Sequence, residues 1–164
     1  GAGETTLRDG LGNEERTGAG DVQVMSAGTG IEHAEYNLED EPTALFQIWI
    51  MPDRRGGEPS WGARPFPKDG RDGQFVALAS GIAGDGDALP IRANARVLGA
   101  TIKAGDSVTY TTDPDRHSYL VAATGKVTIN DVQAQARDGV AITGLDRFTV
   151  TALEDAELVL VDAA

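Results

Sequence analysis

His33 and Glu35 are the residues whose types and spacing most directly suggest chemistry. His33 is one of only two histidines in the sequence, and it follows a glycine-rich stretch at residues 28–30. In a β-strand, side chains at positions i and i+2 point to the same face, so the imidazole and the carboxylate would be presented together. Such a pair can bind a divalent metal of the iron, manganese, nickel, copper or zinc kind. A surface or core histidine beside an ordinary carboxylate has the same spacing, because His-x-Glu is short and common.

The composition narrows the classes of function. The 164 residues include 26 acidic and 14 basic ones, which gives a net charge of −12 and no basic run. A nucleic-acid backbone would be repelled by such a chain, so we expect no nucleic-acid contact. No apolar stretch is long enough to span a bilayer, no signal peptide is visible, and cysteine is absent. We therefore expect a cytoplasmic protein without membrane contact or disulfides. Because the chain starts at Gly1 and not at a methionine, we also expect the gene product to extend further toward the N-terminus.

The pattern of glycines and short apolar runs predicts strands. The 21 glycines separate apolar runs of a few residues, and no segment has a sustained helical period. Residues 45–51 are apolar on both faces and are predicted to form a fully buried strand. The segment 52–73, rich in proline, glycine and charge, is predicted to be a connector, and 81–89 a loop. The remaining predicted strands are 21–25, 74–80, 96–102, 107–111, 118–123, 126–129, 132–136, 140–142, 148–152 and 157–161.

Short strands at this spacing predict an all-β fold of small antiparallel barrels. A weak internal repeat relates residues 12–51 to residues 130–161, each with a turn, a strand, an Asp/Gly corner and a final apolar strand. Four further strands precede the second copy, whereas only about ten residues precede the first. We therefore predict a partial N-terminal half-barrel with its connector at residues 1–73 and a complete barrel at residues 74–164.

The residues around His33 also resemble a known motif. Gly20, the turn at residues 26–28, His33 and Asn37 are similar to the second cupin motif, in which a glycine-bounded strand leads to a metal-binding histidine. This sequence has Ser26 where that motif has proline, and a longer turn before the histidine. With those departures the sequence resembles the pirin family. The segments 9–13 (DGLGN) and 47–52 (QIWIMP) fit its bacterial, quercetinase-like members.

The resemblance implies a bicupin, two antiparallel barrels of which the N-terminal one carries iron or a similar divalent metal. Family members bind that metal with three histidines and one glutamate, and His33 and Glu35 match the third histidine and the glutamate. The first two ligands of the family belong to a His-x-His motif that this sequence lacks, and we expect that motif before Gly1. The metal is therefore expected to bind weakly or not at all to this chain as written.

The resemblance further implies a quercetin 2,3-dioxygenase-type oxidoreductase, which opens a flavonol-like small molecule with molecular oxygen. Glu35 would then be catalytic as well as metal-ligating, because a carboxylate beside the metal can take the proton of the substrate hydroxyl. With half of the metal site absent, we expect negligible activity in this chain. Two alternatives stay open: a non-enzymatic, metal-dependent interaction or regulatory protein, and a structural fragment without activity.

The other histidine and the apolar residues of the first half lead to further expectations. His117 lies in a turn near two aspartates and is expected to face solvent, with a role as a third metal ligand as the alternative. Trp49 and Trp61 are expected to be buried by packing. A half-barrel leaves strand edges unpaired and an apolar face bare, at residues 22, 24, 46, 48 and 50. We therefore expect a homo-oligomer, or a partner that covers this face.

Overall fold

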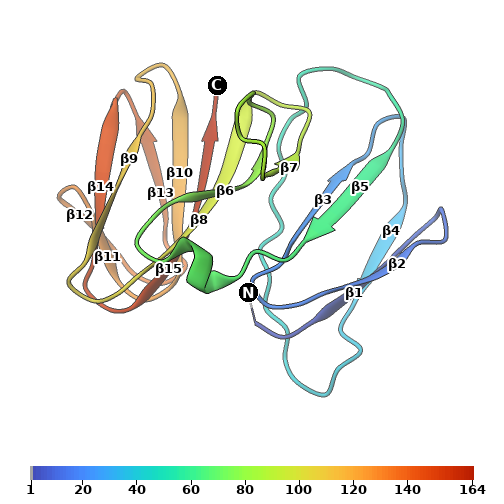
Figure 1. The fold of residues 1–164 in the computed structure, drawn as a ribbon, viewed down its shortest axis with the longest axis horizontal. Helices are drawn as coiled ribbons and strands as arrows, with labels where there is room; N and C mark the ends of the chain where they lie inside the picture. The colour runs from blue at the N-terminus through green and yellow to red at the C-terminus, as the bar shows by residue number, and fades with distance from the viewer. Residues whose placement is uncertain (1) are drawn as a thin grey trace.

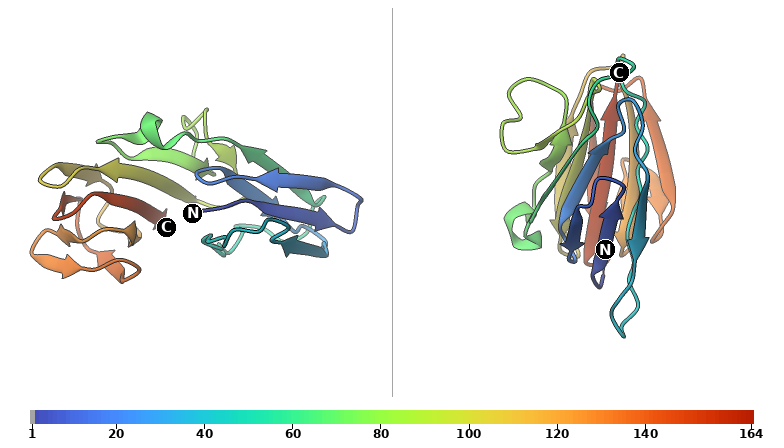
Figure 2. Two further views of the ribbon diagram at one scale, coloured as in Figure 1. Left: turned by 90° about the horizontal axis from the view of Figure 1, so that it is seen from below. Right: turned by 90° about the vertical axis from the view of Figure 1, so that its right-hand side faces the viewer.

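The computed structural model describes residues 2–164 and is built almost entirely of β-strands (Figure 1). The N-terminal half contains β1 (Thr5–Asp9), β2 (Glu14–Thr17), β3 (Val22–Ser26), β4 (His33–Tyr36), β5 (Ser60–Arg64) and a short 3₁₀ helix, η1 (Lys68–Arg71). The C-terminal half contains β6 (Val76–Ser80), β7 (Leu89–Pro90), β8 (Ala95–Ile102), β9 (Ser107–Thr111), β10 (His117–Thr124), β11 (Val127–Ile129), β12 (Val132–Ala134), β13 (Gly139–Thr143), β14 (Arg147–Ala152) and β15 (Ala156–Ala163). The two halves lie side by side along the long axis of the molecule (Figure 2).

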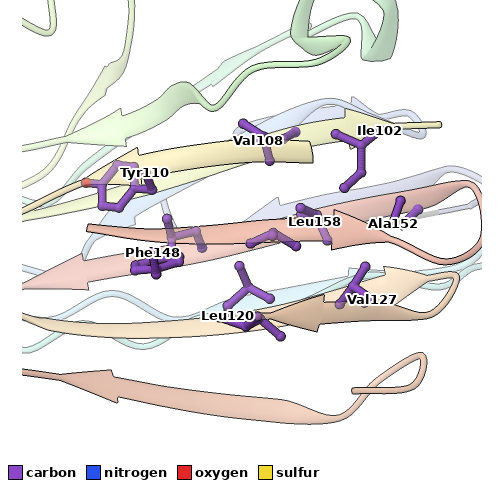
Figure 3. Close-up of a cluster of buried hydrophobic side chains, with 14 of the residues drawn as sticks. Ile102, Val108, Tyr110, Leu120, Val127, Phe148, Ala152 and Leu158 are labelled. Carbon is purple, nitrogen blue, oxygen red and sulfur yellow. The ribbon is translucent and has the colours of Figure 1, made fainter. Parts of the chain in front are cut away.

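Two facing sheets form the C-terminal half. One has six strands in the order β13-β10-β15-β8-β6-β7, and the other has four in the order β12-β11-β14-β9. All of these pairings are antiparallel except β6 with β7. On β15, buried and half-buried residues alternate because every second side chain enters the space between the sheets. Leu120, Leu160, Val127 and Val150 have no exposed surface, and they belong to the core drawn in Figure 3.

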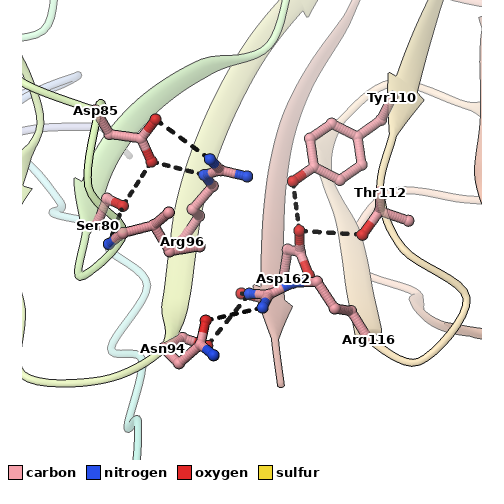
Figure 4. Close-up of polar contacts among 9 residues, drawn as sticks. Ser80, Asp85, Asn94, Arg96, Tyr110, Thr112, Arg116 and Asp162 are labelled. Carbon is pink, nitrogen blue, oxygen red and sulfur yellow. Dashed lines mark hydrogen bonds and ion pairs between the residues drawn. The ribbon is translucent and has the colours of Figure 1, made fainter.

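A buried polar network lies beside this apolar core (Figure 4). Asp162 is fully buried and accepts hydrogen bonds from Tyr110 Oη at 2.5 Å, from Thr112 Oγ1 at 3.2 Å and from Arg116 Nε at 2.8 Å. A buried carboxylate is tolerated only when it is paired and hydrogen-bonded, and these three donors meet that requirement. The alternating pattern of β15 places Asp162 on the core side, but the sequence did not reveal its partners.

The N-terminal half is more open. Its strands form a three-stranded sheet, β2-β1-β4, and a separate two-stranded sheet, β3-β5. Val22 and Val24 of β3, with Ile50, pack against the outer face of the six-stranded sheet near Val97 and Val159. This apolar contact joins the two halves, because the burial of such surface stabilises the folded chain.

Most of the predicted strands are confirmed, and the main errors lie in the first half. Residues 45–51 do not form a strand: Trp49 and Met51 are 88% and 87% exposed, and Ala44 makes a single bridge to Ala2. An apolar run becomes a strand only where another strand pairs with it, and residues 2–164 supply no such partner for residues 45–51. The predicted connector at 52–73 contains β5 and η1, so that part of the prediction is also wrong. Trp61, in contrast to Trp49, is half-buried.

In the described part of the chain, no helix has the length and apolar character needed to cross a membrane.

Candidate metal-binding site

The turn before β4 fixes where His33 begins the strand. Gly28 and Gly30 have φ values of 55° and 131°, which L-residues with side chains seldom adopt. Gly30 N donates to the carbonyl oxygen of Ala27 at 2.8 Å, and Thr29 N donates to that of Gly57 at 3.0 Å. A Cβ atom at position 28 would overlap the backbone at Gly57, so glycine is needed there for conformation and for space. The glycine-rich stretch is therefore a tight turn that places His33 at the start of β4.

His33 and Glu35 lie on one face of β4, as their spacing predicted. The strand pairs with β1 in antiparallel register, which sets Glu35 opposite Leu7 and His33 opposite Asp9. Leu7, His33 and Glu35 all line the same large hollow, and both polar side chains are exposed to it. Paired residues on neighbouring antiparallel strands share a face, which explains why these three side chains point to the same space.

Asp9 is the cross-strand partner of His33, but its carboxylate is already engaged. Asp9 Oδ1 accepts hydrogen bonds from the backbone N–H groups of Leu11 at 3.0 Å and Asn13 at 2.8 Å, and Oδ2 accepts from Asn13 Nδ2 at 2.7 Å. The Asn13 side chain, with these backbone groups, lowers the pKa of Asp9. The carboxylate therefore closes the turn between β1 and β2, and it is not available as a third donor beside His33.

The hollow lies between the N-terminal sheets and the outer face of the six-stranded sheet, and its volume is about 1140 Å³. One side is formed by β1, β3 and β4, and the other by β6, β8 and β15. Residues 44–52 run along it, and their exposed apolar side chains contribute to its wall. Its volume is slightly above the usual range of about 300–1,000 Å³ for small-molecule sites, which are mostly apolar with a few polar groups.

The donor types at His33 and Glu35 suit a divalent transition metal, but the number of donors is too small. Imidazole and carboxylate together bind such ions, and catalytic metal sites usually have three protein ligands. Among residues 2–164, no group of three or more His, Cys, Asp or Glu side chains is arranged to hold a metal ion. These residues thus offer part of a metal site and do not complete it.

His117, the alternative third ligand, does not join this pair. It begins β10, where it is paired with Thr143 and Ala163, and its side chain is exposed. The expectation of a solvent-facing histidine is confirmed.

A second polar group in the hollow was not found from the sequence. Arg71, at the end of η1, lines the hollow and is only 9% exposed. It lies in a segment predicted to be a surface connector, and an arginine among glycines and prolines has no pattern that indicates burial. The nearest signal was Gly99 inside an apolar strand, since such a glycine often marks a place where another group approaches closely.

Two family models match the two halves. The model of the pirin family matches residues 1–50, and that of the quercetinase C-terminal cupin domain matches residues 77–163. The chain is 63% identical over 162 residues to a pirin-like protein of Caulobacter vibrioides, covering 99% of this chain and 70% of that protein. The chain belongs to the pirin family. It is also 35% identical over 161 residues to the quercetin 2,3-dioxygenase of Escherichia coli K12, covering 98% of this chain and 68% of that enzyme.

Solved structures of pirins have the same fold. The structure of YhhW from Escherichia coli superposes with a TM-score of 0.89 at 32% identity, over 99% of this chain and 68% of YhhW. A second YhhW structure, a bacterial pirin in complex with nickel(II), has a TM-score of 0.85 at 32% identity, over 99% of this chain and 69% of that one. The predicted all-β, cupin-type fold and the family resemblance are confirmed. The division at residue 73 and the ligand roles of His33 and Glu35 stay predictions.

Proposed function

We propose that this pirin-family chain carries part of the metal centre of a quercetin 2,3-dioxygenase-type oxidoreductase. The observation that supports this most is the placement of His33 and Glu35 side by side on β4, facing a hollow large enough for a flavonol. The name of the Escherichia coli relative and the nickel(II) complex of YhhW support the reaction class and the presence of a divalent metal. Iron or a similar ion is the metal we expect.

In this proposal the two side chains have separate roles. His33 is a metal ligand, and it has no other function in the site. Glu35 is a metal ligand and accepts the proton of the substrate hydroxyl, because an exposed carboxylate within reach of that hydroxyl can act as a general base. A bound metal would supply a Lewis acid for the flavonol oxygens. With two donors the described residues hold a metal weakly, so we propose that this chain alone has negligible dioxygenase activity.

Elemental analysis tests the ligand assignment. The chain, a His33→Ala variant and a Glu35→Gln variant are loaded with nickel(II) or iron(II), and bound metal is titrated at increasing metal concentration. We expect weak binding by the unmodified chain. In either variant the metal affinity should fall by about tenfold or more, since loss of one of two ligands removes half of the donor set. His117→Ala is the matched control, because it removes the other histidine from an exposed strand end and should change nothing.

Two outcomes would contradict the proposal. Equal metal binding by the unmodified chain and the His33→Ala variant would exclude His33 as a ligand. Tight stoichiometric binding together with rapid oxygen uptake in the presence of quercetin would show that the site of this chain is complete, against the weak binding and low activity proposed here.

A further inference from the structure

Arg71 is a buried arginine with hydrogen-bond donors that the protein does not use. Its Nη2 atom donates to the backbone oxygens of Gly20 at 3.0 Å and Phe66 at 2.8 Å. Its Nε atom is buried and has no hydrogen-bond partner among residues 2–164. Leaving a donor of a charged group unsatisfied in the interior is costly, so a partner for it is expected.

The positive charge of Arg71 is not neutralised by a direct ion pair within residues 2–164. Glu157 is the carboxylate that acts on it, but Glu157 already binds Lys68 Nζ at 2.7 Å. Burial lowers the pKa of Arg71 and Glu157 partly offsets this effect, yet an arginine stays protonated at neutral pH. Arg71 is therefore a buried cation of the hollow without a carboxylate partner in the described chain, whereas Arg55 and Arg92, which also line it, are more exposed.

The six-stranded sheet is shaped to receive this guanidinium. Nη1 of Arg71 lies against Gly99 in the middle of β8, where a Cβ atom would overlap it. A central strand glycine usually marks a close approach of this kind. Cross-strand partners of Gly99 are Val76 on β6 and Val159 on β15, so the guanidinium lies over the centre of the outer face.

An apolar wall begins directly beside Arg71. Val97 lies two residues before Gly99 on the same face of β8, and Val159 is the neighbour of Gly99 on β15. Both line the hollow with Arg71, and both belong to the apolar cluster on the outer face. Val22 and Val24 of β3 pack against that cluster and also line the hollow. A buried cation next to such a wall matches a molecule with a negatively charged end and an apolar body.

We propose that this part of the hollow binds an amphipathic organic monocarboxylate. Its carboxylate binds the Arg71 guanidinium through Nη1, which makes no hydrogen bond among residues 2–164, and its apolar part lies along Val97 and Val159. Arginine is well suited to carboxylates because its planar donors match their geometry. A ligand with several negative charges suits the position beside Arg71 less well, since Lys68 is already paired and the chain carries a net charge of −12. The site lies on the C-terminal sheet, apart from His33 and Glu35 on β4 (Figure 1), and does not rest on the proposed metal centre.

Calorimetric titration with decanoate, and with decanol as the uncharged analogue, tests the proposal. The unmodified chain should bind decanoate more tightly than decanol. Arg71→Met should weaken decanoate binding by about tenfold or more, which corresponds to the loss of a charge-assisted hydrogen bond. Arg147→Met is the matched control, since Arg147 is an exposed arginine of β14 on the other sheet. The affinity of this variant for decanoate should equal that of the unmodified chain.

A measurement on the unmodified chain covers the case in which Arg71→Met does not fold. In the NMR spectrum of the labelled protein, the Nε–Hε signal of Arg71 should shift on addition of decanoate and stay in place with decanol. Equal affinity for decanoate and decanol, or an Arg71 signal that decanoate does not move, would overturn the proposal. Equal decanoate affinity of a folded Arg71→Met variant would overturn it as well.

Discussion

Tyr110 donates its phenolic hydrogen to Oδ2 of Asp162 over 2.5 Å, inside the C-terminal half of the molecule (Figure 4). Both side chains are buried. Burial, reinforced by the hydrogen bond to the Asp162 carboxylate and its negative charge, raises the pKa of Tyr110 to about 12. The neutral phenol is thus the form that the fold requires, because an ionised phenolate would face a carboxylate in the interior.

Replacement of Tyr110 by phenylalanine should alter both the stability and its dependence on pH. At pH 7 the loss of one hydrogen bond to a buried carboxylate should lower the free energy of unfolding by about 1–3 kcal/mol. In the unfolded chain Tyr110 titrates near its ordinary pKa of 10.0 and in the folded chain near 12. The unmodified protein should therefore lose up to about 2–3 kcal/mol as the pH rises from 10 to 12, a loss that Tyr110→Phe lacks.

Urea unfolding curves at pH 7, 10 and 12 measure this difference. Tyr119→Phe is the control, since Tyr119 is an exposed tyrosine of β10. Other groups titrate over the same range in both proteins, so the comparison is between variants at each pH. Parallel pH curves for the unmodified chain and Tyr110→Phe would contradict the assignment.

Asp85 should contribute to stability in the opposite pH range. Its carboxylate accepts hydrogen bonds from Arg96 Nε at 2.6 Å and from the Ser80 hydroxyl at 2.6 Å. Both contacts lower the pKa of Asp85 below 3.8, and the contact with Arg96 has the larger effect. A carboxylate whose pKa is lowered by folding stabilises the folded chain fully at pH values above its ordinary pKa. This contribution is lost as the pH falls through the lowered pKa of the folded chain.

The Asp85→Asn variant should be less stable than the unmodified chain by about 1–3 kcal/mol at pH 7, since it removes a charge-assisted hydrogen bond from Arg96. The two proteins should converge as the pH falls from about 3.8 through the lowered pKa of Asp85, where the unmodified carboxylate also becomes neutral. Asp87→Asn, a change of the exposed aspartate in the same loop, is the control. A stability difference that stays constant from pH 7 to pH 3 would show that the charge of Asp85 is not its cause.

Two strand glycines of the six-stranded sheet should respond differently to alanine. At Gly99 the new methyl group would meet Arg71, which is buried and held by two backbone oxygens. At Gly139 it would meet the ring of Tyr119, which is 52% exposed and can turn away. We expect Gly99→Ala to destabilise the protein by about 1–3 kcal/mol, as overpacking does, and Gly139→Ala by less than about 1 kcal/mol. Thermal unfolding measures both, and equal losses would contradict this account of Gly99.

The strands of the C-terminal half could be predicted because their signals are local. On β15, the apolar run 158–161 has the length of a strand and indicates one, although the run itself does not tell which side chains are buried. The placement of His33 and Glu35 on one face could likewise be predicted, since it follows from the period of two in any strand. Their role as metal ligands does not follow from that period, because ligation depends on what else reaches the same point.

Features that depend on contacts distant in the sequence could not be predicted. Arg71 is buried because Gly99, 28 positions further along the chain, leaves space for it, and neither residue indicates the other. Residues 45–51 show the reverse case, since their composition is that of a buried strand while the structure leaves them without a strand partner. Whether an apolar run pairs with a neighbour is decided by the tertiary fold and not by its own residues.

Residues 45–51 lead to the last prediction, which concerns association. Trp49 and Met51 expose 88% and 87% of their surface, and Leu45, Phe46 and Ile48 are each at least 40% exposed along the same hollow. An apolar surface of this extent, next to sheets with open edges, favours self-association in water. We expect light scattering after size-exclusion chromatography to show a dimer or larger species whose share grows with protein concentration.

A double variant, Trp49→Ser with Met51→Ser, should shift this distribution toward the monomer. Leu153→Ser, which removes an exposed apolar side chain outside the hollow, should leave it unchanged. A monomer at high concentration in the unmodified chain, or an equal effect of Leu153→Ser, would exclude this segment as the cause of association.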